Sequence, residues 1–373
     1  MRIGVTRLRD ADDRLVARWR QLALTAAEPN AFSHPDFTLP AALALKDGED
    51  AALLHASAGD ELVFALPVVR RGRYRRVPMT TIATWQHPYC YLGTPLVTNV
   101  DAREAWTAVL HHLRHEVDCD LLALELLPLE APGLGSLEPA AHDERLTVTT
   151  YGRHARPIIE RRPEPDYFDI SMSSKHRKNL RRQRRHLDEH LQGTLQRFDW
   201  AQEERAINMS VELFLTLERE GWKGAAGTAM GCHPDDTAFF RVMVERFAKA
   251  GQLQMWFLEA AGTPVAAQCN LLAGDTVFHF KIAYDEDYAT YSPGVLLELE
   301  MVEEFHHDAR LQRIDSCAAP GSMYEMLYPN SRMLTTALVP LHGAARVAAP
   351  ALAATLRRRE RRAAGRSASD APA

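Results

Sequence analysis

The chain has few cysteines, few lysines and no long hydrophobic run, and these shortages exclude several classes of protein. Its five cysteines are odd in number, lie far apart and form no Cys-x-x-Cys pair. This argues against a disulfide framework and against a structural zinc site. No apolar segment approaches the ~18 residues of a membrane span, and Met1–Arg7 lacks the apolar core of a secretion signal. We therefore expect a cytoplasmic protein that holds no metal.

The formal net charge is −5, which argues against a dedicated nucleic-acid-binding protein, so no DNA partner is expected. The charge is unevenly spread, however. Residues 170–190 carry seven Lys and Arg against two acids, and residues 345–373 again carry seven against two. Each basic segment predicts contact with an anionic ligand or a membrane surface, unless the acidic remainder of the chain neutralises it.

The length of 373 residues predicts two domains, because a typical domain has about 150 residues. In the second half, apolar periodicity and tight glycine turns predict the order β-α-α-β-β-β-α-β-α-β. The predicted helices there are 173–191, 203–219, 234–247, 292–308 and 322–327, and the predicted strands are 194–198, 253–260, 264–272, 276–284, 311–317 and 332–339.

The first half predicts a fainter copy of the same order. Its predicted helices are 12–24, 35–44 and 102–117, and its predicted strands are 51–57, 62–70, 80–84, 121–126 and 146–150. We therefore expect an α/β (α+β) protein with two similar domains, each a mixed, mostly antiparallel sheet flanked by helices. The expected divisions are 1–160, 161–342 and an Ala/Arg-rich tail, 343–373, which is either a solvated helix or disordered.

Four stretches resemble a known family. They are Ser173-Ser174-Lys175-His176-Arg177-Lys178-Asn179-Leu180-Arg181-Arg182, then Glu218-Arg219-Glu220-Gly221-Trp222-Lys223-Gly224, then Phe280–Tyr288 with Tyr291-Ser292-Pro293-Gly294, and finally Asp315-Ser316-Cys317. In that order they resemble the CelD/BcsL-type acetyltransferases of the GNAT fold, and the doubled organisation is similar to the tandem-GNAT Fem peptidyltransferases. The resemblance covers about residues 170–339. It implies tandem GNAT-like domains, with acetyl-CoA as acyl donor and a sugar or glycan acceptor.

The resemblance also implies a donor site. In a GNAT-like fold, acyl-CoA lies between two splayed parallel strands, and its pyrophosphate lies at the N-terminus of the following helix. Here that site would involve Tyr291, Ser292, Gly294 and Val295. The family signature Gln/Arg-x-x-Gly-x-Gly/Ala is altered, because Ala289 and Ser292 stand at two of its three key positions. An ordinary helix start at this point is the alternative.

Acyl transfer needs a base for the acceptor and an acid for the departing thiolate. Asp315, at a strand end, is the first candidate for the base, and Asp285 is the second. Tyr324 stands where many GNAT enzymes have a general-acid tyrosine, although it equally suits core packing. Cys317 is a weaker candidate nucleophile, because the spacing places no histidine beside it.

Period-2 alternation puts His279, Lys281, Ala283 and Asp285 on one face of their strand. A polar row of this kind suits an acceptor amine or hydroxyl. Lys281 would stabilise negative charge on the thioester carbonyl oxygen.

Substrate contacts are expected in two further segments. Trp222 and Lys223 lie in a Gly-rich loop, where an indole can serve as a platform for a sugar or adenine ring. His176, Arg177 and Lys178 lie on the basic helix, whose anionic partner would be CoA, an anionic glycan, a lipid-linked sugar diphosphate or tRNA. The alternatives are a packing tryptophan and a solvated charged helix.

The sequence thus predicts an acyl-CoA-dependent N- or O-acetyltransferase that acts on a sugar or exopolysaccharide precursor. A Fem-like transferase that uses aminoacyl-tRNA is a second hypothesis, with the basic helix binding RNA. A non-catalytic subunit of an exopolysaccharide assembly is a third, because of the altered residues Ala289 and Ser292.

Overall fold

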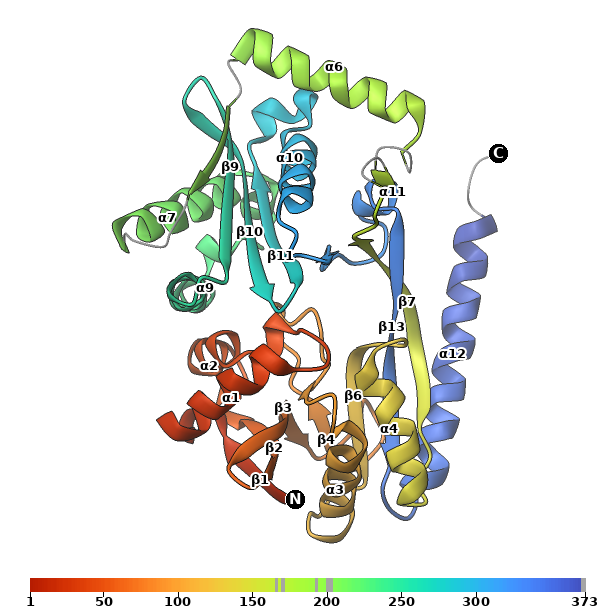
Figure 1. Cartoon of the computed structure of the whole chain (residues 1–373). Coiled ribbons are helices and arrows are strands. Elements are labelled where there is room, and N and C mark those ends of the chain that lie inside the picture. The colour runs from red at the N-terminus through yellow and green to blue at the C-terminus, as the bar shows by residue number, and fades with distance from the viewer. Residues whose placement is uncertain (165–166, 169–171, 192–193, 199–203, 370–373) are drawn as a thin grey trace. The chain divides into compact units, whose positions relative to one another are not determined.

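The computed structural model describes residues 1–164, 167–168, 172–191, 194–198 and 204–369 (Figure 1). Contacts divide the chain into two compact units. The first unit comprises Met1–Thr38, Asp47–Ala155 and Arg332–Ala373, and the second comprises Leu39–Lys46 and Arg156–Ser331.

The sheet of the first unit has the strand order β1-β2-β3-β4-β6-β13, with β5 paired to β3. Within the described residues, its ladders of known register are antiparallel except the parallel pair β4 and β6. Its strands are β1 (Arg2–Arg7), β2 (Ala51–Ala58), β3 (Glu61–Arg71), β4 (Thr81–Thr84), β5 (Leu96–Val97), β6 (Leu121–Pro128) and β13 (Asn330–Pro340). Its helices are α1 (Asp13–Thr25), α3 (Ala102–His115), α4 (Pro132–Asp143) and α12 (Ala345–Ser369). The helix α2 (Pro35–Ala44) begins in the first unit and, from Leu39 on, belongs to the second.

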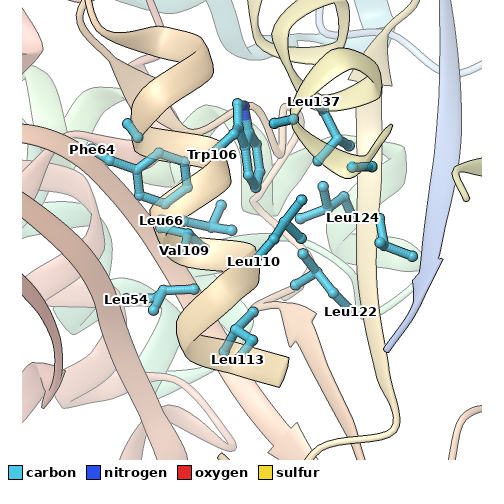
Figure 2. Packing of buried hydrophobic residues seen from close by; sticks show 14 of the residues in the cluster. Leu54, Phe64, Leu66, Trp106, Val109, Leu110, Leu113, Leu122, Leu124 and Leu137 are labelled. Carbon is cyan, nitrogen blue, oxygen red and sulfur yellow. The ribbon is translucent and has the colours of Figure 1, made fainter. Parts of the chain in front are cut away.

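The core of the first unit forms where α3 packs on the sheet (Figure 2). The apolar side chains of α3 recur every three or four residues and therefore share one helical face. Trp106 on this face is fully buried and meets Phe64 of β3 edge to face, with 4.8 Å between ring centroids. Its indole N–H donates to the main-chain oxygen of Gly133 at 3.0 Å, which ties α3 to α4.

The second unit contains the sheet β7-β12-β11-β10-β9-β8, in which β7 enters from the first unit. The strands β11 and β12 are parallel, and the other ladders of known register are antiparallel. The strands are β7 (Thr149–Glu160), β8 (Thr194–Phe198), β9 (Leu253–Ala260), β10 (Thr263–Ala273), β11 (Thr276–Tyr284) and β12 (Arg313–Asp315). The helices are α6 (Ser174–Leu191), α7 (Glu204–Glu220), α8 (Trp222–Ala225), α9 (Pro234–Lys249), α10 (Pro293–His307) and α11 (Tyr324–Leu327). The expected mixed, mostly antiparallel sheet flanked by helices is confirmed.

A β-bulge in β11 corrects the predicted polar face of this strand. Cys269 of β10 pairs with Lys281, whereas the next residue, Asn270, pairs with His279, so Phe280 is the extra residue. Because one extra residue reverses the alternation of side chains, His279 and Lys281 lie on opposite faces of the sheet. His279 contacts α10 and Lys281 contacts α7, and Figure 1 shows these helices on opposite sides of β9–β11. The predicted row His279–Lys281–Ala283 is therefore wrong.

Most other predicted elements are present within a few residues of their expected bounds. The exceptions are β1, β5 and α4, which were not predicted, and β7, which extends to Glu160 instead of ending at residue 150. Trp222 and Lys223, expected in a Gly-rich loop, lie instead in the short helix α8 (Trp222–Ala225). The strand expected at 311–317 is reduced to Arg313–Asp315, and the tail forms helix α12. None of the helices described is both long and apolar enough to cross a membrane.

Candidate functional site

The parallel strands β11 and β12 separate after only three residue pairs. Their ladder joins Thr276 to Arg313, Val277 to Ile314 and Phe278 to Asp315. β12 ends at Asp315, whereas β11 continues for six further residues to Tyr284. Among the described residues, no strand pairs with this continuation on the side of β12. The main-chain groups of β11 on that side are thus available to a ligand that lies between the strands.

A buried polar cluster lies beside the point of separation, on the face covered by α10. The hydroxyl of Tyr328 donates to Glu298 Oε1 at 2.5 Å and lies 3.1 Å from His279 Nδ1. His279 Nδ1 is also 3.4 Å from Glu298 Oε2, which accepts from Gln268 Nε2 at 3.3 Å. Burial lowers the pKa of His279, with Glu298 and Asp315 opposing the shift. The imidazole is therefore neutral near pH 7.

The other ring nitrogen of His279, Nε2, is buried and has no hydrogen-bond partner among the described residues. His279 also borders a pocket of about 260 Å³ beneath the C-terminal end of α10. A neutral imidazole with one nitrogen held by Glu298 and Tyr328 and the other unpaired can accept a proton.

Tyr324, the predicted general acid, belongs to this same cluster. Its ring is 5.9 Å from that of His279 and 5.1 Å from that of Tyr328. Burial raises the pKa of Tyr324 well above 10, with nearby Glu298 and Cys317 adding to the shift. Its hydroxyl therefore stays protonated at neutral pH, as a proton donor requires.

Asp315, the predicted base, is fully buried and held by the protein. Its Oδ1 accepts the N–H of Cys317 at 2.8 Å and lies 3.7 Å from Arg156 Nη1. Cys317 has a positive φ of 53°, a strained conformation for a residue with a side chain. Asp315 thus fixes the strained turn at the exact end of the parallel ladder.

A second charged cluster lies on the α7 face of β11. Glu218 of α7 is fully buried, and its Oε1 lies 3.2 Å from Lys223 Nζ and 3.4 Å from Lys281 Nζ. Its Oε2 accepts the N–H of Met230 at 2.8 Å. Lys223 also donates to the main-chain oxygen of Ile282 at 2.5 Å. Two ammonium groups thus share one carboxylate, which leaves a formal charge of +1 in a mostly buried place.

Close backbone packing after α7 positions Lys223 for these contacts. A Cβ on Gly224 would lie 1.7 Å from the main-chain oxygen of Arg219, so no larger residue fits there. Burial lowers the pKa of Lys223, and Lys281 adds to the shift while Glu218 opposes it. Trp222 remains half exposed, with Lys223 Nζ 5.9 Å from its ring centroid. Trp222, Lys223 and Lys281 are thus brought together.

The N-terminus of α10, the predicted pyrophosphate site, offers few free N–H groups. Pro293 has none, and the N–H groups of Val295 and Leu296 bond to the main-chain oxygen of Ser292. Ser292 has left-handed backbone angles, and its hydroxyl accepts from Gln183 Nε2 of α6 at 2.9 Å. A Cβ on Gly294 would lie 3.4 Å from Ile282 Cδ1 of β11, an ordinary van der Waals distance, so the start of α10 has room for a small side chain.

The remaining predicted donor and base residues have packing or capping contacts. Tyr291 packs against the cluster that contains Leu187 and Leu296, and Val295 packs against the cluster that contains Leu180 and Val302. Asp285 accepts the N–H of Asp287 at 3.0 Å and caps the 3-10 turn Glu286–Tyr291. Asp285 therefore contributes to the loop that leads into α10, and no contact between it and Lys281 is described.

The basic helix α6 covers α10. Leu180 and Leu187 are buried against it, and Arg184 Nη1 is 2.6 Å from Glu300 of α10. No ion partner is found among the described residues for Lys175, Lys178 or Arg181, all of which are exposed. Arg177 is half-buried and lines, with Leu180, a groove of about 430 Å³ between α6 and α10. The side chain of His176 lies outside the described residues.

The sequence did not single out Glu218, Glu298 or Tyr328, and it did not assign His279 a catalytic role. Glu218 stands in the quoted segment 218–224, so that resemblance was the available signal for it. Nothing in the spacing of His279, Glu298 and Tyr328 indicates that they meet, since contacts between a strand and two later helices depend on the tertiary fold.

Residues 174–322 match the family described as acetyltransferase (GNAT) domain. No curated protein matches the chain. Solved structures with similar folds include that of FemX, with 9% identity, a TM-score of 0.57 and coverage of 91% of this chain and 97% of that one. The C-terminal domain (DUF2156) of a putative lysylphosphatidylglycerol synthetase from Agrobacterium fabrum has 12% identity, a TM-score of 0.53 and coverage of 91% and 96%.

A third similar structure is a conserved protein of unknown function from Bacteroides thetaiotaomicron VPI-5482, with 13% identity, a TM-score of 0.52 and coverage of 88% and 97%. At such low identities these likenesses concern the fold. The fold is GNAT-like, and the domain match over residues 174–322 supports an acyltransferase.

Proposed function

We propose that the chain is a CelD/BcsL-type acetyltransferase, which moves an acyl group from a CoA thioester to an amine or hydroxyl of a sugar or exopolysaccharide precursor. The observation that carries this proposal is the parallel pair β11–β12, which ends after three residue pairs while β11 continues. A donor that lies in this gap can bond to the unpaired main-chain groups of β11. Its thioester then lies beside the buried cluster of His279 and Tyr324.

The proposed reaction is a direct transfer. The acceptor nitrogen or oxygen attacks the thioester carbonyl carbon, the carbon–sulfur bond breaks, and CoA leaves as a thiolate. His279 Nε2 takes the acceptor proton, and the Tyr324 hydroxyl gives a proton to the thiolate. Glu298 and Tyr328 hold the other nitrogen of His279. Asp315, in this mechanism, is a positioning residue that fixes the turn at Cys317.

The cluster of Lys281, Lys223 and Glu218 suits the binding of an acceptor that carries a negative charge. Its net positive charge is mostly buried, which strengthens attraction for an anion. The half-exposed Trp222 beside it supplies an apolar platform for a sugar ring. We therefore assign the binding of the acceptor's anionic group to Trp222, Lys223 and Lys281, and we propose an acidic or phosphorylated sugar as the acceptor. Because His279 lies on the other face of the sheet, the reacting amine or hydroxyl would reach it through the gap beside β11, where β12 has ended.

Titration of the full chain with acetyl-CoA tests the donor. Binding is expected at concentrations up to about 1 mM, the upper end of the usual range for enzyme substrates. Transfer is then followed by the release of free CoA thiol in the presence of sugar acceptors. If no acetyl-CoA binds at about 1 mM, the proposed use of a CoA thioester as acyl donor is excluded.

Replacing Tyr324 tests the assigned proton donor. Tyr324→Phe is expected to lower kcat by about 100-fold or more with little change in KM, because the proton is transferred in the chemical step. Tyr167→Phe is the matched control, since it also removes a hydroxyl in the second unit, one that lies 2.9 Å from His306 Nε2. Equal activity of both variants would exclude Tyr324 as the general acid.

The exposed cations of α6 favour a second candidate, a transferase that uses aminoacyl-tRNA. Lys175, Lys178 and Arg181 would contact phosphates, and each contact would add to the dependence of affinity on salt. Steeply salt-dependent tRNA binding together with failure to bind acetyl-CoA would favour this reading. A non-catalytic assembly subunit would instead function normally in cells as the double variant Asp315→Asn/Lys281→Ala.

A further inference from the structure

Three potential metal ligands meet on the surface of the first unit, where α3 packs against α4. His111 and His115 lie four residues apart on α3, and Glu144 directly follows α4. One ligand atom from each of the three side chains lies within 4.8 Å of the others. All three residues belong to the first unit and are remote in sequence from the cluster proposed for acyl transfer.

The geometry of the three side chains suits one small cation. Residues four apart on a helix point from the same face, and the two imidazole centroids are 4.5 Å apart. Glu144 Oε1 is 3.3 Å from His111 Nδ1. In a tetrahedral zinc site with bonds of about 2.0–2.1 Å, neighbouring ligand atoms are roughly 3.3 Å apart. Both histidines are exposed, so small side-chain rotations bring all three ligands to that spacing.

Glu144 is the fixed member of the set. Its carboxylate is only 15% exposed, and its Oε2 lies 3.8 Å from Arg114 Nη1. The same guanidinium nitrogen donates to the main-chain oxygen of Glu144 at 2.5 Å. Arg114 thus holds the backbone and one carboxylate oxygen, and the other oxygen is left facing His111. Outer contacts that orient a ligand in this way are typical of metal sites.

We propose that His111, His115 and Glu144 bind a divalent transition-metal ion, Zn²⁺, at the junction of α3 and α4. Two imidazoles and one carboxylate suit Zn²⁺, whereas Mg²⁺ and Ca²⁺ prefer oxygen ligands alone. Three protein ligands leave a fourth position for water, open to a surface depression of about 820 Å³ that His111 and Glu144 line with Thr107 and His112. The ion would join α3 to the end of α4.

Zinc titration by calorimetry tests the site, with the full chain freed of any affinity tag and stripped of metal with EDTA. One Zn²⁺ per chain is expected. His111→Ala and Glu144→Gln are each expected to weaken binding by about tenfold or more. Co²⁺ in place of Zn²⁺ is expected to give the visible d–d absorption of a tetrahedral site, and the same variants are expected to lose it.

His112→Ala is the matched control. His112 is the neighbour of His111 on the same helix, but its Nδ1 is 3.1 Å from Glu116 Oε2. This variant is expected to keep the affinity and the Co²⁺ spectrum, and circular dichroism checks that every variant is folded. No stoichiometric binding, or equal affinity in His111→Ala, His112→Ala and the unaltered chain, would overturn the proposal.

Discussion

At the scale of single residues, Glu218 is a buried carboxylate that depends on two lysine side chains. It has no solvent exposure, and it is the carboxylate that Lys223 and Lys281 share. Removing its charge would take from the two mostly buried ammonium groups the carboxylate that they share. Breaking a buried ion pair in this way costs about 3–5 kcal/mol, more than the pair itself contributes.

Glu218→Gln is therefore expected to lower the free energy of unfolding by about 3 kcal/mol. It is also expected to lower the pKa of Lys223 further, because Glu218 is the group that opposes its downward shift. Urea unfolding measures the first effect. Glu220→Gln changes an exposed residue two positions away, and it is expected to leave the urea concentration at the midpoint of unfolding almost unchanged. If Glu218→Gln lowers the free energy of unfolding only slightly, the two lysines must find other partners or contact solvent.

The sequence indicated some of these residues but not the contacts between them. The four lysines at 175, 178, 223 and 281 stand in the segments that resemble the family, and two of them meet at Glu218. Local patterns could not show that Lys223 and Lys281, 58 positions apart, share one carboxylate. The proposed role of Tyr324 as acid suits its buried place. Asp315, the predicted base, has its Oδ1 bonded to the Cys317 N–H and 3.7 Å from Arg156, which favours the positioning role proposed for it.

At the scale of elements, the bulge in β11 decides which side chains can act together. Strict alternation would put His279 and Lys281 on one face, and one extra residue at Phe280 separates them. No glycine marks this bulge, so the sequence of the strand gave no local signal for it. Phe280 packs against Phe239 and Phe240 of α9. The extra residue of the bulge is thus a buried aromatic ring that packs on α9.

The helix α6 also packs on α10, and Leu187 is a buried residue at this contact. Leu187 is fully buried between α6, the sheet and α10. Leu187→Ala is expected to lower the free energy of unfolding by about 2–4 kcal/mol, because it removes buried methyl groups and leaves a cavity. Thermal or urea unfolding measures this loss.

Arg185→Ala is the matched control on the same helix. Its side chain is 64% exposed, and within the described part of the chain its ion partner is Glu189, four residues on, so a change of less than about 0.5 kcal/mol is expected. A Leu187→Ala protein as stable as this control would show that α6 adds little to the stability of the second unit. The basic helix would then be a loosely attached surface element.

At the scale of the whole molecule, the repeated order of elements was the most predictable property. Both halves follow helical and alternating periodicities that are local in sequence, and the GNAT-like fold confirms their interpretation. The elements that escaped prediction have weak local patterns. The helix α4 contains Pro139 and two glycines, and β1 is largely exposed and polar. Such segments become regular through pairing and packing with distant parts of the chain.

Two histidines of the first unit make its free energy of unfolding depend on pH, and their burial comes from contacts between distant parts of the chain. Burial lowers the pKa of His34 to about 4 and that of His87 to about 3. In the unfolded chain both titrate near about 6.5. Between these values the unfolded state binds more protons than the folded state, so the free energy of unfolding falls as the pH falls below about 6.5. From pH 7 to 5, each histidine should cost about 2 kcal/mol.

His87→Gln isolates this effect, because it removes one of the two groups. The free energy of unfolding of the variant, minus that of the unaltered chain, is expected to rise by about 2 kcal/mol between pH 7 and pH 5. His142→Gln, at an exposed position on α4, is the matched control for the loss of a histidine side chain. Urea unfolding at a series of pH values measures both differences. Parallel curves for His87→Gln and the unaltered chain would mean that His87 becomes protonated without unfolding, through a local opening around Trp85 and Phe37, whose rings pack against it.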